Sequence, residues 1–362
     1  MSDEHRLAAV VSAFCVDGEL RSAERYGSGH IHDTYSVRFS DDRGGGHILL
    51  QRINTHIFKN PVAVMENIER VTRHIRAGLD RVPDARRRVL QLARTREGRP
   101  WFVDGEEKYW RAYSFIEGAQ TFDEVASARQ AFEAAKAFGK FQHMLTDVRG
   151  ERLAETIPNF HNTPKRFLDF ELAIDQDLAG RRREAQQEIG LAMARRAIAG
   201  ALADAGLPER VTHNDTKLNN VLLDEKTGEG ICVIDLDTVM PGLVAHDFGD
   251  MVRTMTCPVA EDEQDLSRIE MRFPLFEGVL RGYLAGAGDF LTGEERQSLI
   301  AGAKVIVFEQ GIRFLTDFLN GDKYYKVSRP GQNLDRCRTQ FRLLQSLEQQ
   351  ESAMVRLLRS VV

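Results

Sequence analysis

The stretch His213-Asn214-Asp215-Thr216-Lys217-Leu218-Asn219-Asn220 decides the expected fold of this chain, and an apolar run, Cys232-Val233-Ile234, leads from it to Asp235. Phosphoryl transfer from a nucleotide needs this order of groups. One carboxylate orients a hydroxyl, an ammonium meets the moving phosphoryl, and an amide and a second carboxylate hold Mg²⁺. The alternative is a solvated loop, since loops favour Asn and Asp. The spacing favours phosphoryl transfer, because four polar residue types and a buried strand would otherwise have to coincide.

The length and composition of the chain are those of a globular protein with two parts. With 362 residues the chain exceeds the size of most single cores, so two lobes or domains are expected. Apolar residues make up 42% and charged residues 28%, which is ordinary globular usage. The formal net charge of −5 argues against a nucleic-acid partner, because such proteins normally carry a basic excess.

Neither a membrane nor an oxidising compartment is indicated. The run 1–6 is acidic and lacks an apolar core of signal-peptide length, and no run of about 18 apolar residues exists to span a membrane. The cysteines have no C-x-x-C spacing, so neither a zinc site nor a disulfide framework is expected. They are Cys15, Cys232, Cys257 and Cys337. Reduced thiols fit a cytoplasmic protein, which is the location we expect.

Hydrophobic periodicity predicts an α+β fold. The first part should contain a glycine loop before a hairpin, two helices and several strands, at 1–18, 34–39, 47–53, 61–79, 89–94, 101–103 and 109–116. After Gly118 we expect helices at 126–145, 167–177, 184–205, 270–284, 293–320 and 333–358, interrupted at 211–240 by the catalytic loop and two short strands. The expected architecture is a small antiparallel-sheet, nucleotide-binding lobe at 1–117 and a larger helical lobe at 118–362, with a cleft between them.

Six motifs together resemble the aminoglycoside phosphotransferase and choline kinase superfamily, which has a protein-kinase-like fold, and the resemblance covers nearly the whole chain. They are G-S-G-H-I-H-D-T at 27–34, L-Q-R-I-N at 50–54, H-N-D-T-K-L-N-N at 213–220, V-I-D-L-D-T-V-M-P-G at 233–242, H-D-F-G-D at 246–250 and R-F-L-T-D at 313–317. Within the superfamily they are most similar to N-acetylhexosamine 1-kinases. The resemblance implies that ATP and Mg²⁺ are used to phosphorylate the anomeric 1-hydroxyl of N-acetylglucosamine or N-acetylgalactosamine. The residues alone support a kinase.

The catalytic loop supplies the candidate base and metal ligands. Asp215 would receive the hydroxyl proton as catalytic base, with a capping residue in a turn as the alternative. Lys217 would neutralise charge on the transferred phosphoryl, with an ordinary surface lysine as the alternative. By spacing and resemblance, Asn220 and Asp235 are the Mg²⁺ ligands, since Mg²⁺ shared with phosphates needs hard oxygen ligands. Asp237 would take a second Mg²⁺ or play a structural role, and the sequence favours neither.

A second candidate metal motif, Asp247-Phe248-Gly249, is the D-F-G of protein kinases. No apolar strand leads into it, and Pro241-Gly242 precedes it as a turn, whereas Asp235 follows a strand that could hold it rigidly. We therefore assign the metal to Asp235. The resemblance implies that Asp247 braces the catalytic loop through hydrogen bonds and that His213 is structural.

The nucleotide should lie between the glycine loop, a strand and the segment that joins the lobes. Glycine allows close backbone approach to phosphates, although an ordinary hairpin turn is the alternative for this loop. Gln51 and Arg52 stand where protein kinases carry a lysine, and they point to opposite faces of the sheet. We choose Arg52 for its charge, with Glu66 or Glu69 as its acidic partner, and Gln51 remains the alternative. The predicted nucleotide residues are Gly27, Gly29, Arg52 and, in the segment that meets the adenine, Ser114 and Ile116.

A sugar site needs convergent polar groups and an aromatic platform. The candidates are His32, Asp33, Asn214, Arg253, Arg313, Asp317 and Tyr324. Arg313 and Asp317 are one helical turn apart, so both could enter the cleft, or they could form a surface ion pair worth about 0.3–0.5 kcal/mol.

Two other functions compete with the sugar 1-kinase. One is a related kinase for choline, homoserine or an aminoglycoside, and the acidic run Glu261-Asp262-Glu263 would suit a polycationic aminoglycoside. The other is a nucleotide-binding pseudokinase scaffold, against which the intact Asp215, Asn220 and Asp235 argue. A protein kinase is disfavoured, because no A-P-E motif follows Asp235. The expected partners are a small sugar and a nucleotide, with no nucleic acid and no membrane, and the sequence does not indicate the oligomeric state.

Overall fold

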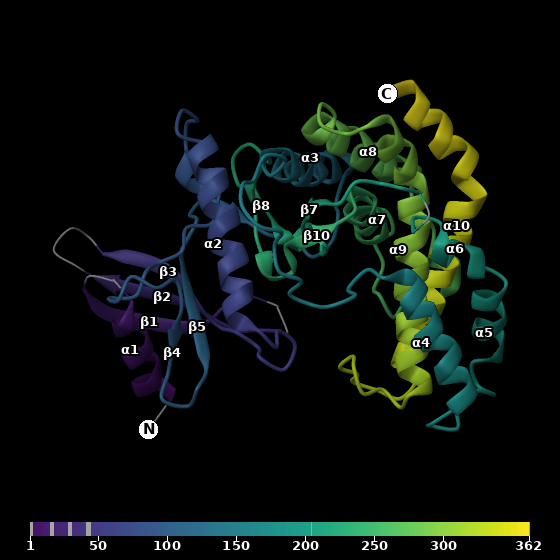
Figure 1. Ribbon diagram of the computed structural model, residues 1–362, viewed down its shortest axis with the longest axis horizontal. Coiled ribbons are helices and arrows are strands. Elements are labelled where there is room, and N and C mark those ends of the chain that lie inside the picture. The colour runs from purple at the N-terminus through teal and green to yellow at the C-terminus, as the bar shows by residue number, and fades with distance from the viewer. Residues whose placement is uncertain (1–2, 15–17, 28–30, 41–44, 204, 362) are drawn as a thin grey trace.

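The computed structural model describes residues 3–14, 18–27, 31–40, 45–203 and 205–361. It has the predicted α+β fold, with a small antiparallel sheet in the N-terminal part and mainly helices in the rest of the chain (Figure 1). Helix α2 (Pro61–Gly78) lies between the sheet and the helical part. Among the described residues, no helix is long and apolar enough to cross a membrane.

Five strands form the N-terminal sheet, in the order β1-β2-β3-β5-β4, and all neighbours are antiparallel. They are β1 (Glu19–Arg25), β2 (Asp33–Ser40), β3 (Gly46–Arg52), β4 (Phe102–Val103) and β5 (Tyr109–Ser114). The hairpin of β2 and β3 is the one that the sequence predicted. Helix α1 (Asp3–Ala13) covers one face of the sheet, where Val10 and Val11 share an apolar cluster with Ile48 and Leu50 of β3.

The packing of β3 decides which of its polar side chains face the helical part of the molecule. Ile48 and Leu50 lie in the cluster under α1, and successive side chains of a strand point to opposite faces. Leu49 and Gln51 therefore face the other way, and Arg52 lies on the face that α1 covers.

The rest of the chain is helical around two small sheets. The helices are α3 (Ala128–Met144), α4 (Thr163–Gln176), α5 (Gln186–Met193), α6 (Arg196–Gly200), α7 (Val244–Met255), α8 (Phe273–Ala287), α9 (Gly293–Leu319) and α10 (Gln332–Val361). One sheet holds β6 (Ala119–Gln120), β8 (Val221–Asp224) and β9 (Gly230–Val233), and the other holds β7 (Arg210–Thr212) and β10 (Met240–Gly242). Helices α3 and α8 pack closely because glycine stands at their contact: a Cβ at Gly282 would lie 2.2 Å from the Phe132 carbonyl oxygen.

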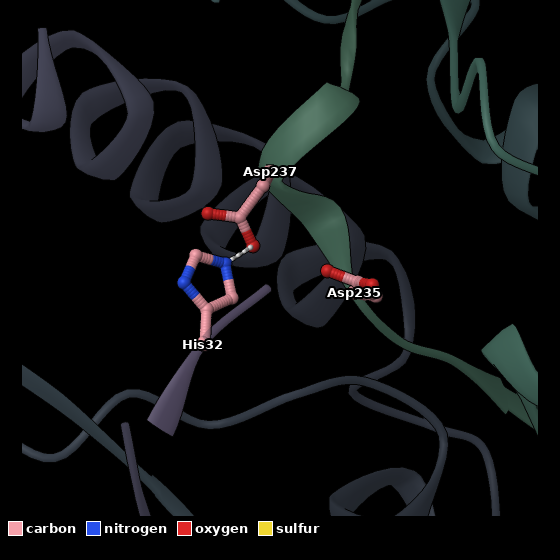
Figure 2. A group of neighbouring side chains, drawn as sticks. All are labelled: His32, Asp235 and Asp237. Atoms are coloured by element: carbon pink, nitrogen blue, oxygen red, sulfur yellow. Dashed lines mark ion pairs between the residues drawn. The ribbon is translucent and has the colours of Figure 1, made fainter. Parts of the chain in front are cut away.

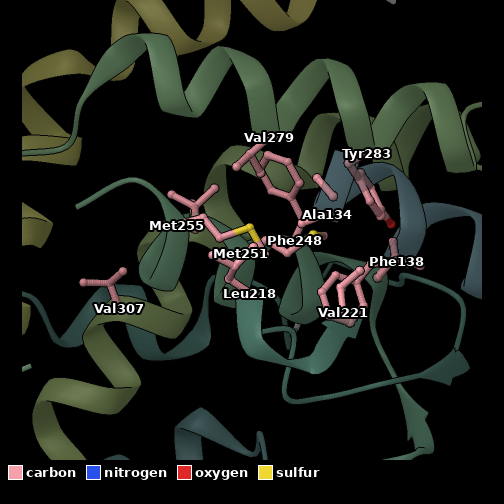
Figure 3. Close-up of a cluster of buried hydrophobic side chains, with 14 of the residues drawn as sticks. Ala134, Phe138, Leu218, Val221, Phe248, Met251, Met255, Val279, Tyr283 and Val307 are labelled. Atoms are coloured by element: carbon pink, nitrogen blue, oxygen red, sulfur yellow. The ribbon is translucent and has the colours of Figure 1, made fainter. Parts of the chain in front are cut away.

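The catalytic loop rests on a buried apolar cluster (Figure 3). Phe248 and Met251 of α7 belong to the same cluster as Leu218 and Val221 of the loop and Phe138 of α3, and none is more than 3% exposed. Protein interiors are packed as densely as organic crystals, so such a cluster fixes the position of what it carries. Packing against α7 and α3 therefore fixes the position of the loop backbone.

Two expectations for the first 25 residues differ from the structure. The first helix ends at Ala13 and not near Gly18, because Phe14 already forms an extended bridge with Thr95; residues 15–17 lie outside the described residues. Strand β1 was not predicted, because its sequence E-L-R-S-A-E-R is mostly polar and its side chains are largely exposed.

Three further differences concern later segments. The strand expected at 89–94 makes only an isolated bridge from Leu92 to β5. The helix expected at 184–205 is two helices, α5 and α6, and contains Gly190 and Gly200, which weaken helices. Helix α7 was not predicted, because we interpreted its residues only as a motif. The lobe boundary at 117–118 stays a prediction.

Candidate active site

A cleft of about 250 Å³ lies between the N-terminal sheet and the catalytic loop. Leu49 and Gln51 line it from the sheet, and Lys217 and Asp235 line it from the opposite side. A larger cavity of about 360 Å³ lies behind the catalytic loop, but Asp235 is not part of its lining. We take the cleft as the candidate active site, because it joins apolar walls to the few polar groups that the chemistry needs.

Asp215 stands at the centre of a compact polar group. Its Oδ2 lies 3.0 Å from Nζ of Lys217 and accepts a hydrogen bond of 3.1 Å from Nδ2 of Asn220. Burial by itself would raise the pKa of Asp215, but the positive charge of Lys217 and the neighbouring His213 bring that pKa below its usual value. In turn, the Asp215 carboxylate raises the pKa of Lys217. The pair is therefore ionised at neutral pH, and Asp215 can accept a hydrogen bond from a hydroxyl.

Asp247 holds the backbone of the catalytic loop. Its Oδ2 accepts a hydrogen bond of 2.8 Å from the backbone N–H of His213, and its Oδ1 accepts one of 2.7 Å from that of Asn214. Gln142 of α3 donates a third, of 2.6 Å, to Oδ2. Asp247 is completely buried and is not among the residues that line the cleft. The D-F-G aspartate thus has the bracing position that the sequence interpretation gave it.

The side chains of His213 and Asn214 also make hydrogen bonds to neighbouring groups of the protein. Nε2 of His213 donates to the Ile234 carbonyl at 2.9 Å, so this histidine has the expected structural position. Nδ2 of Asn214 donates to the Thr238 carbonyl at 2.9 Å, and its Oδ1 accepts from Oγ1 of Thr212 at 3.1 Å. Because both polar atoms of Asn214 have internal partners, the structure does not place this predicted sugar residue in the cleft.

Arg253 supports the loop from α7. The backbone N–H of Thr216 donates to Oδ2 of Asp250 at 2.7 Å, and Nε of Arg253 donates to Oδ1 of the same carboxylate at 2.9 Å. Nη1 of Arg253 also lies 3.3 Å from Glu261. The charge of Arg253 helps to lower the pKa of Asp215. Arg253 is not among the residues that line the cleft, so its predicted role beside the acceptor stays a prediction.

Asn220 and Asp235 are adjacent at the edge of the cleft. The backbone N–H of Ile234 donates to the Asn220 carbonyl at 2.9 Å, which joins the end of the catalytic loop to the residue before Asp235. Asp235 has a φ of 58°, a left-handed conformation that is uncommon outside glycine and is often found at functional sites. Burial and the carboxylates of Asp237 and Asp215 raise the pKa of Asp235 to about 6.

These residues fit a bound Mg²⁺. Within the described part of the chain, Asp235 accepts no hydrogen bond, and its charge is opposed by those of two other carboxylates. A divalent cation would relieve this repulsion. Nδ2 of Asn220 is bound to Asp215, which leaves the side-chain oxygen of Asn220 as a hard donor of the kind that Mg²⁺ prefers.

Asp237 is engaged differently from Asp235. It lies in a 3₁₀ turn, Leu236–Thr238, and points toward His32, whose Nε2 is 3.5 Å from Asp237 Oδ2 (Figure 2). Its two oxygens also accept hydrogen bonds of 2.7 and 2.6 Å from the guanidinium of Arg111. The alternation of side chains along a strand therefore does not apply to Asp235 and Asp237. Even so, His32, Asp235 and Asp237 offer ligand atoms within 4.8 Å of one another.

Arg111, on β5, is a residue of the site that the sequence analysis missed. Its side chain is 1% exposed, and its Nε donates to Oε1 of Gln51 at 2.9 Å. Burial alone would lower the pKa of Arg111, but the charge of Asp237 raises it, so the guanidinium stays charged. The available signal was a charged residue in the otherwise apolar and aromatic run Tyr109–Ser114, although nothing in the sequence identified its distant partner.

Most of the predicted nucleotide residues that the structure describes lie at the cleft. Gly27, Ser114 and Ile116 line it, and Gly27 has a φ of +81° that favours glycine. Gly29 lies outside the described residues. The nucleotide-binding roles of these residues stay predictions, but Gly27, Ser114 and Ile116 lie together at the cleft.

Arg52 is the exception, and the structure corrects its placement. Gln51 lines the cleft, whereas Arg52 points to the opposite face of the sheet and donates to Oδ2 of Asp33 at 2.8 Å through Nε. Glu69, one of the two acids that we expected as the partner of Arg52, lies 2.6 Å from Arg94. The same geometry turns Asp33, a predicted sugar residue, away from the cleft. Because β3 packs on α1, Gln51 and not Arg52 faces the cleft, although we chose Arg52 for its charge.

Of the remaining sugar candidates, His32 lines the cleft, but Arg313, Asp317 and Tyr324 gather around a separate hollow between α4 and α9. Asp317 does not pair with Arg313. Its carboxylate accepts hydrogen bonds of 2.8 to 2.9 Å from the backbone N–H groups of 323–325 and from Nδ2 of Asn333. Tyr324 is 64% exposed. The structure brings these three residues together, but not with Asp215.

Arg313 belongs to a buried network that reaches the catalytic loop. Its Nη1 lies 3.8 Å from Glu309, which in turn accepts from Nδ1 of His161 at 2.9 Å. Nε2 of the same histidine donates to the Asn214 carbonyl at 3.1 Å. His161 and Glu309 were not identified from the sequence, which offers no motif for them.

The chain also matches the model of a protein family. The family model described as the phosphotransferase enzyme family matches residues 22–287, which is most of the chain. The chain therefore belongs to the phosphotransferase enzyme family.

Solved structures of small-molecule kinases share the fold. A microcompartment-associated aminopropanol kinase has a TM-score of 0.60 and 16% identity, with 97% of this chain and 98% of that chain covered. A spectinomycin phosphotransferase, solved with ADP and spectinomycin, has a TM-score of 0.57 and 12% identity, with 95% and 98% covered. The choline kinase from Cryptosporidium parvum Iowa II has a TM-score of 0.56 and 14% identity, with 99% and 98% covered. At these identities the likeness concerns the fold.

Proposed function

We propose that this phosphotransferase is an ATP-dependent kinase that phosphorylates the anomeric 1-hydroxyl of an N-acetylhexosamine. The observation that carries the proposal is the position of Asp215: an ionised carboxylate beside the cleft, 3.0 Å from the Lys217 ammonium and next to the pair Asn220 and Asp235. Kinase chemistry needs these groups in this arrangement, because it depends on positioning and charge neutralisation.

The residues of the loop suggest a role for each group. The acceptor oxygen would form a bond to the γ-phosphorus as the bond to the ADP oxygen breaks, and the hydroxyl proton would pass to Asp215. Lys217 would neutralise the negative charge that the transferred group carries. Asn220 and Asp235 would hold Mg²⁺, which supplies further neutralisation of the phosphate oxygens when it is bound.

The acidic run 261–263, which suggested a polycationic acceptor, is engaged in ion pairs of the protein itself. Each carboxylate of the acidic run 261–263 already has an arginine partner. The pairs are Glu261 with Arg253 and Arg336, Asp262 with Arg329, and Glu263 with Arg268. With its acids neutralised in this way, the run offers little attraction to an aminoglycoside, so this alternative loses the feature that supported it.

The choice of an anomeric hydroxyl rests on the motifs of the sequence and on the strength of the base. A carboxylate with a lowered pKa is a weak base. An anomeric hydroxyl is more acidic than an ordinary alcohol, so it gives up its proton to such a base more readily. The resemblance of the motifs at 27–34, 213–220 and 313–317 supports the N-acetylhexosamine.

Release of ADP from ATP and Mg²⁺ with a panel of acceptors tests the proposal. The panel holds N-acetylglucosamine, N-acetylgalactosamine, glucose, choline, homoserine and kanamycin, and Asp215→Asn serves as the inactive control. We expect acceptor-dependent ADP release with the two N-acetylhexosamines. Release driven by choline, homoserine or kanamycin instead would assign a related kinase, and no release with any acceptor, despite tight ATP binding, would support a pseudokinase.

A further inference from the structure

We propose that Asp237 is the buried counter-ion of Arg111 and not a ligand for a second metal, so that this active site takes one divalent cation, held by Asn220 and Asp235. The inference rests on the proposed kinase function, because it concerns the cation that accompanies the nucleotide. It assigns Arg111 as a positioning residue that holds Asp237 and Gln51 in the wall of the cleft.

The contacts of Arg111 carry the first step. Nη1 and Nη2 donate to the two oxygens of Asp237 at 2.7 and 2.6 Å, and Nε donates to Oε1 of Gln51 at 2.9 Å. All three nitrogens of the guanidinium are therefore used. Only 1% of the Arg111 side chain and 2% of the Asp237 side chain are exposed. A parallel two-point contact between guanidinium and carboxylate is the strongest form of ion pair, especially where water is excluded.

A second divalent cation at Asp237 would disturb this pair. Mg²⁺ binds oxygen at about 2.0–2.1 Å and demands near-octahedral geometry. An ion so close to a carboxylate that already accepts from the guanidinium would bring two positive centres into one buried space. His32 completes the group of possible ligands, but an imidazole nitrogen is a poor substitute for the oxygen that Mg²⁺ prefers. Asp237 therefore lacks what a metal ligand needs, which is uncompensated charge.

Asp235 has the opposite character. Within the described residues it accepts no hydrogen bond, whereas both oxygens of Asp237 accept one from the Arg111 guanidinium. The two aspartates also point in different directions: Asp237 reaches His32, and Asp235 lies to one side (Figure 2). The two carboxylates, which are one residue apart, thus have different roles. Asp235 would bind the metal, and Asp237 balances the charge of Arg111.

Counting bound metal ions tests this assignment without a turnover measurement. Mn²⁺ replaces Mg²⁺ as the probe, and electron paramagnetic resonance measures free Mn²⁺ in titrations of the full chain with ADP. We expect one bound Mn²⁺ per protein–ADP complex. Asp235→Asn should weaken that binding at least about tenfold. Two Mn²⁺ ions per wild-type complex would overturn the inference.

The variants of the ion pair decide the role of Asp237. Asp237→Leu alone leaves a buried guanidinium without its partner and should lower the melting temperature strongly. The double variant Arg111→Met with Asp237→Leu removes both charges, so it should fold and bind one Mn²⁺ with a Kd within about 3-fold of wild type. A folded double variant whose Mn²⁺ affinity falls tenfold or more would show that Asp237 is a ligand. If wild type binds one Mn²⁺ with ADP but phosphorylates no sugar, the proposed function fails while this inference stands.

Discussion

Nζ of Lys217, a residue that lines the cleft, lies 3.0 Å from Oδ2 of Asp215. The ammonium holds the carboxylate in its charged form. It also lies where it could meet the transferred phosphoryl, so one contact serves both the base and the phosphate.

Asp215→Asn should keep the affinity for ADP and lower turnover by roughly 10² or more, because general-base catalysis contributes about that much. Steady-state kinetics and calorimetric ADP titration measure the two effects. Asp169→Asn, a partly exposed aspartate of α4, is the matched control and should behave like wild type. Turnover of Asp215→Asn within a few fold of wild type would remove this residue from the mechanism.

Asp247→Ala and Asp235→Asn should have opposite effects. Asp247→Ala leaves two backbone N–H groups and the Gln142 amide unpaired in a buried site, so unfolding free energy should fall by about 3 kcal/mol or more. Asp235→Asn keeps a residue that tolerates the left-handed conformation, so it should retain stability and lose metal binding. Urea unfolding and Mn²⁺ titration measure these effects. Loss of metal binding in a folded Asp247→Ala, with normal binding in Asp235→Asn, would reverse our assignment.

Gln51→Leu should raise the KM for ATP about tenfold, because it removes a polar group from the cleft wall and an acceptor from Arg111. Arg52→Gln should leave this KM unchanged and cost at most about 1 kcal/mol of stability, since Arg52 pairs with Asp33 on the other face. The two variants stand next to each other on β3 and control for each other. A rise in KM only for Arg52→Gln would mean that Arg52, and not Gln51, contacts the nucleotide.

The pair of His161 and Glu309 should make stability depend on pH. Burial alone would lower the pKa of His161, but the charge of Glu309 raises it above 6.5. Glu309 keeps a pKa of about 2 and so remains charged. The stabilisation from a protonated His161 is therefore complete below the unfolded-state pKa of 6.5 and is lost as pH rises through the higher folded-state pKa.

The stability difference between wild type and His161→Gln should thus be largest near pH 6 and shrink as the pH is raised from there. Urea unfolding across this range measures it. The neighbouring His246 has a pKa lowered to about 3 by burial and by His161, so it is neutral in the folded protein across this range. A difference that grows as pH rises would contradict the charged pair.

The catalytic loop could be predicted from sequence because its groups are local. Asp215, Lys217 and Asn220 fall within six residues, and their spacing alone specifies one loop. The antiparallel sheet and long helices were also predictable, since their apolar periodicity is strong. The lack of a strand before Asp247 argued against a metal ligand there, and the family resemblance implied its bracing position, with which its buried contacts with the loop agree.

The parts that the sequence could not predict depend on distant contacts. Ile48, Leu49 and Leu50 are all apolar, so no alternation showed which face of β3 packs on α1, and Gln51 and Arg52 could not be distinguished. The partners Arg111 and Asp237 are far apart in the chain and share no motif. Asp317 lies one turn after Arg313, yet its carboxylate caps a loop that only the folded chain brings to it.

The measurement that most directly tests the central proposal is phosphorus NMR of the product made from N-acetylglucosamine and ATP. The proposal predicts phosphate on carbon 1, seen as coupling between phosphorus and the anomeric proton. It also predicts a kcat/KM at least about tenfold higher for N-acetylglucosamine than for glucose, because a site built for the acetamido group leaves its polar groups unpaired when that group is missing. A 6-phosphate, or equal rates on the two sugars, would contradict the N-acetylhexosamine 1-kinase while leaving the phosphotransferase family and its fold in place.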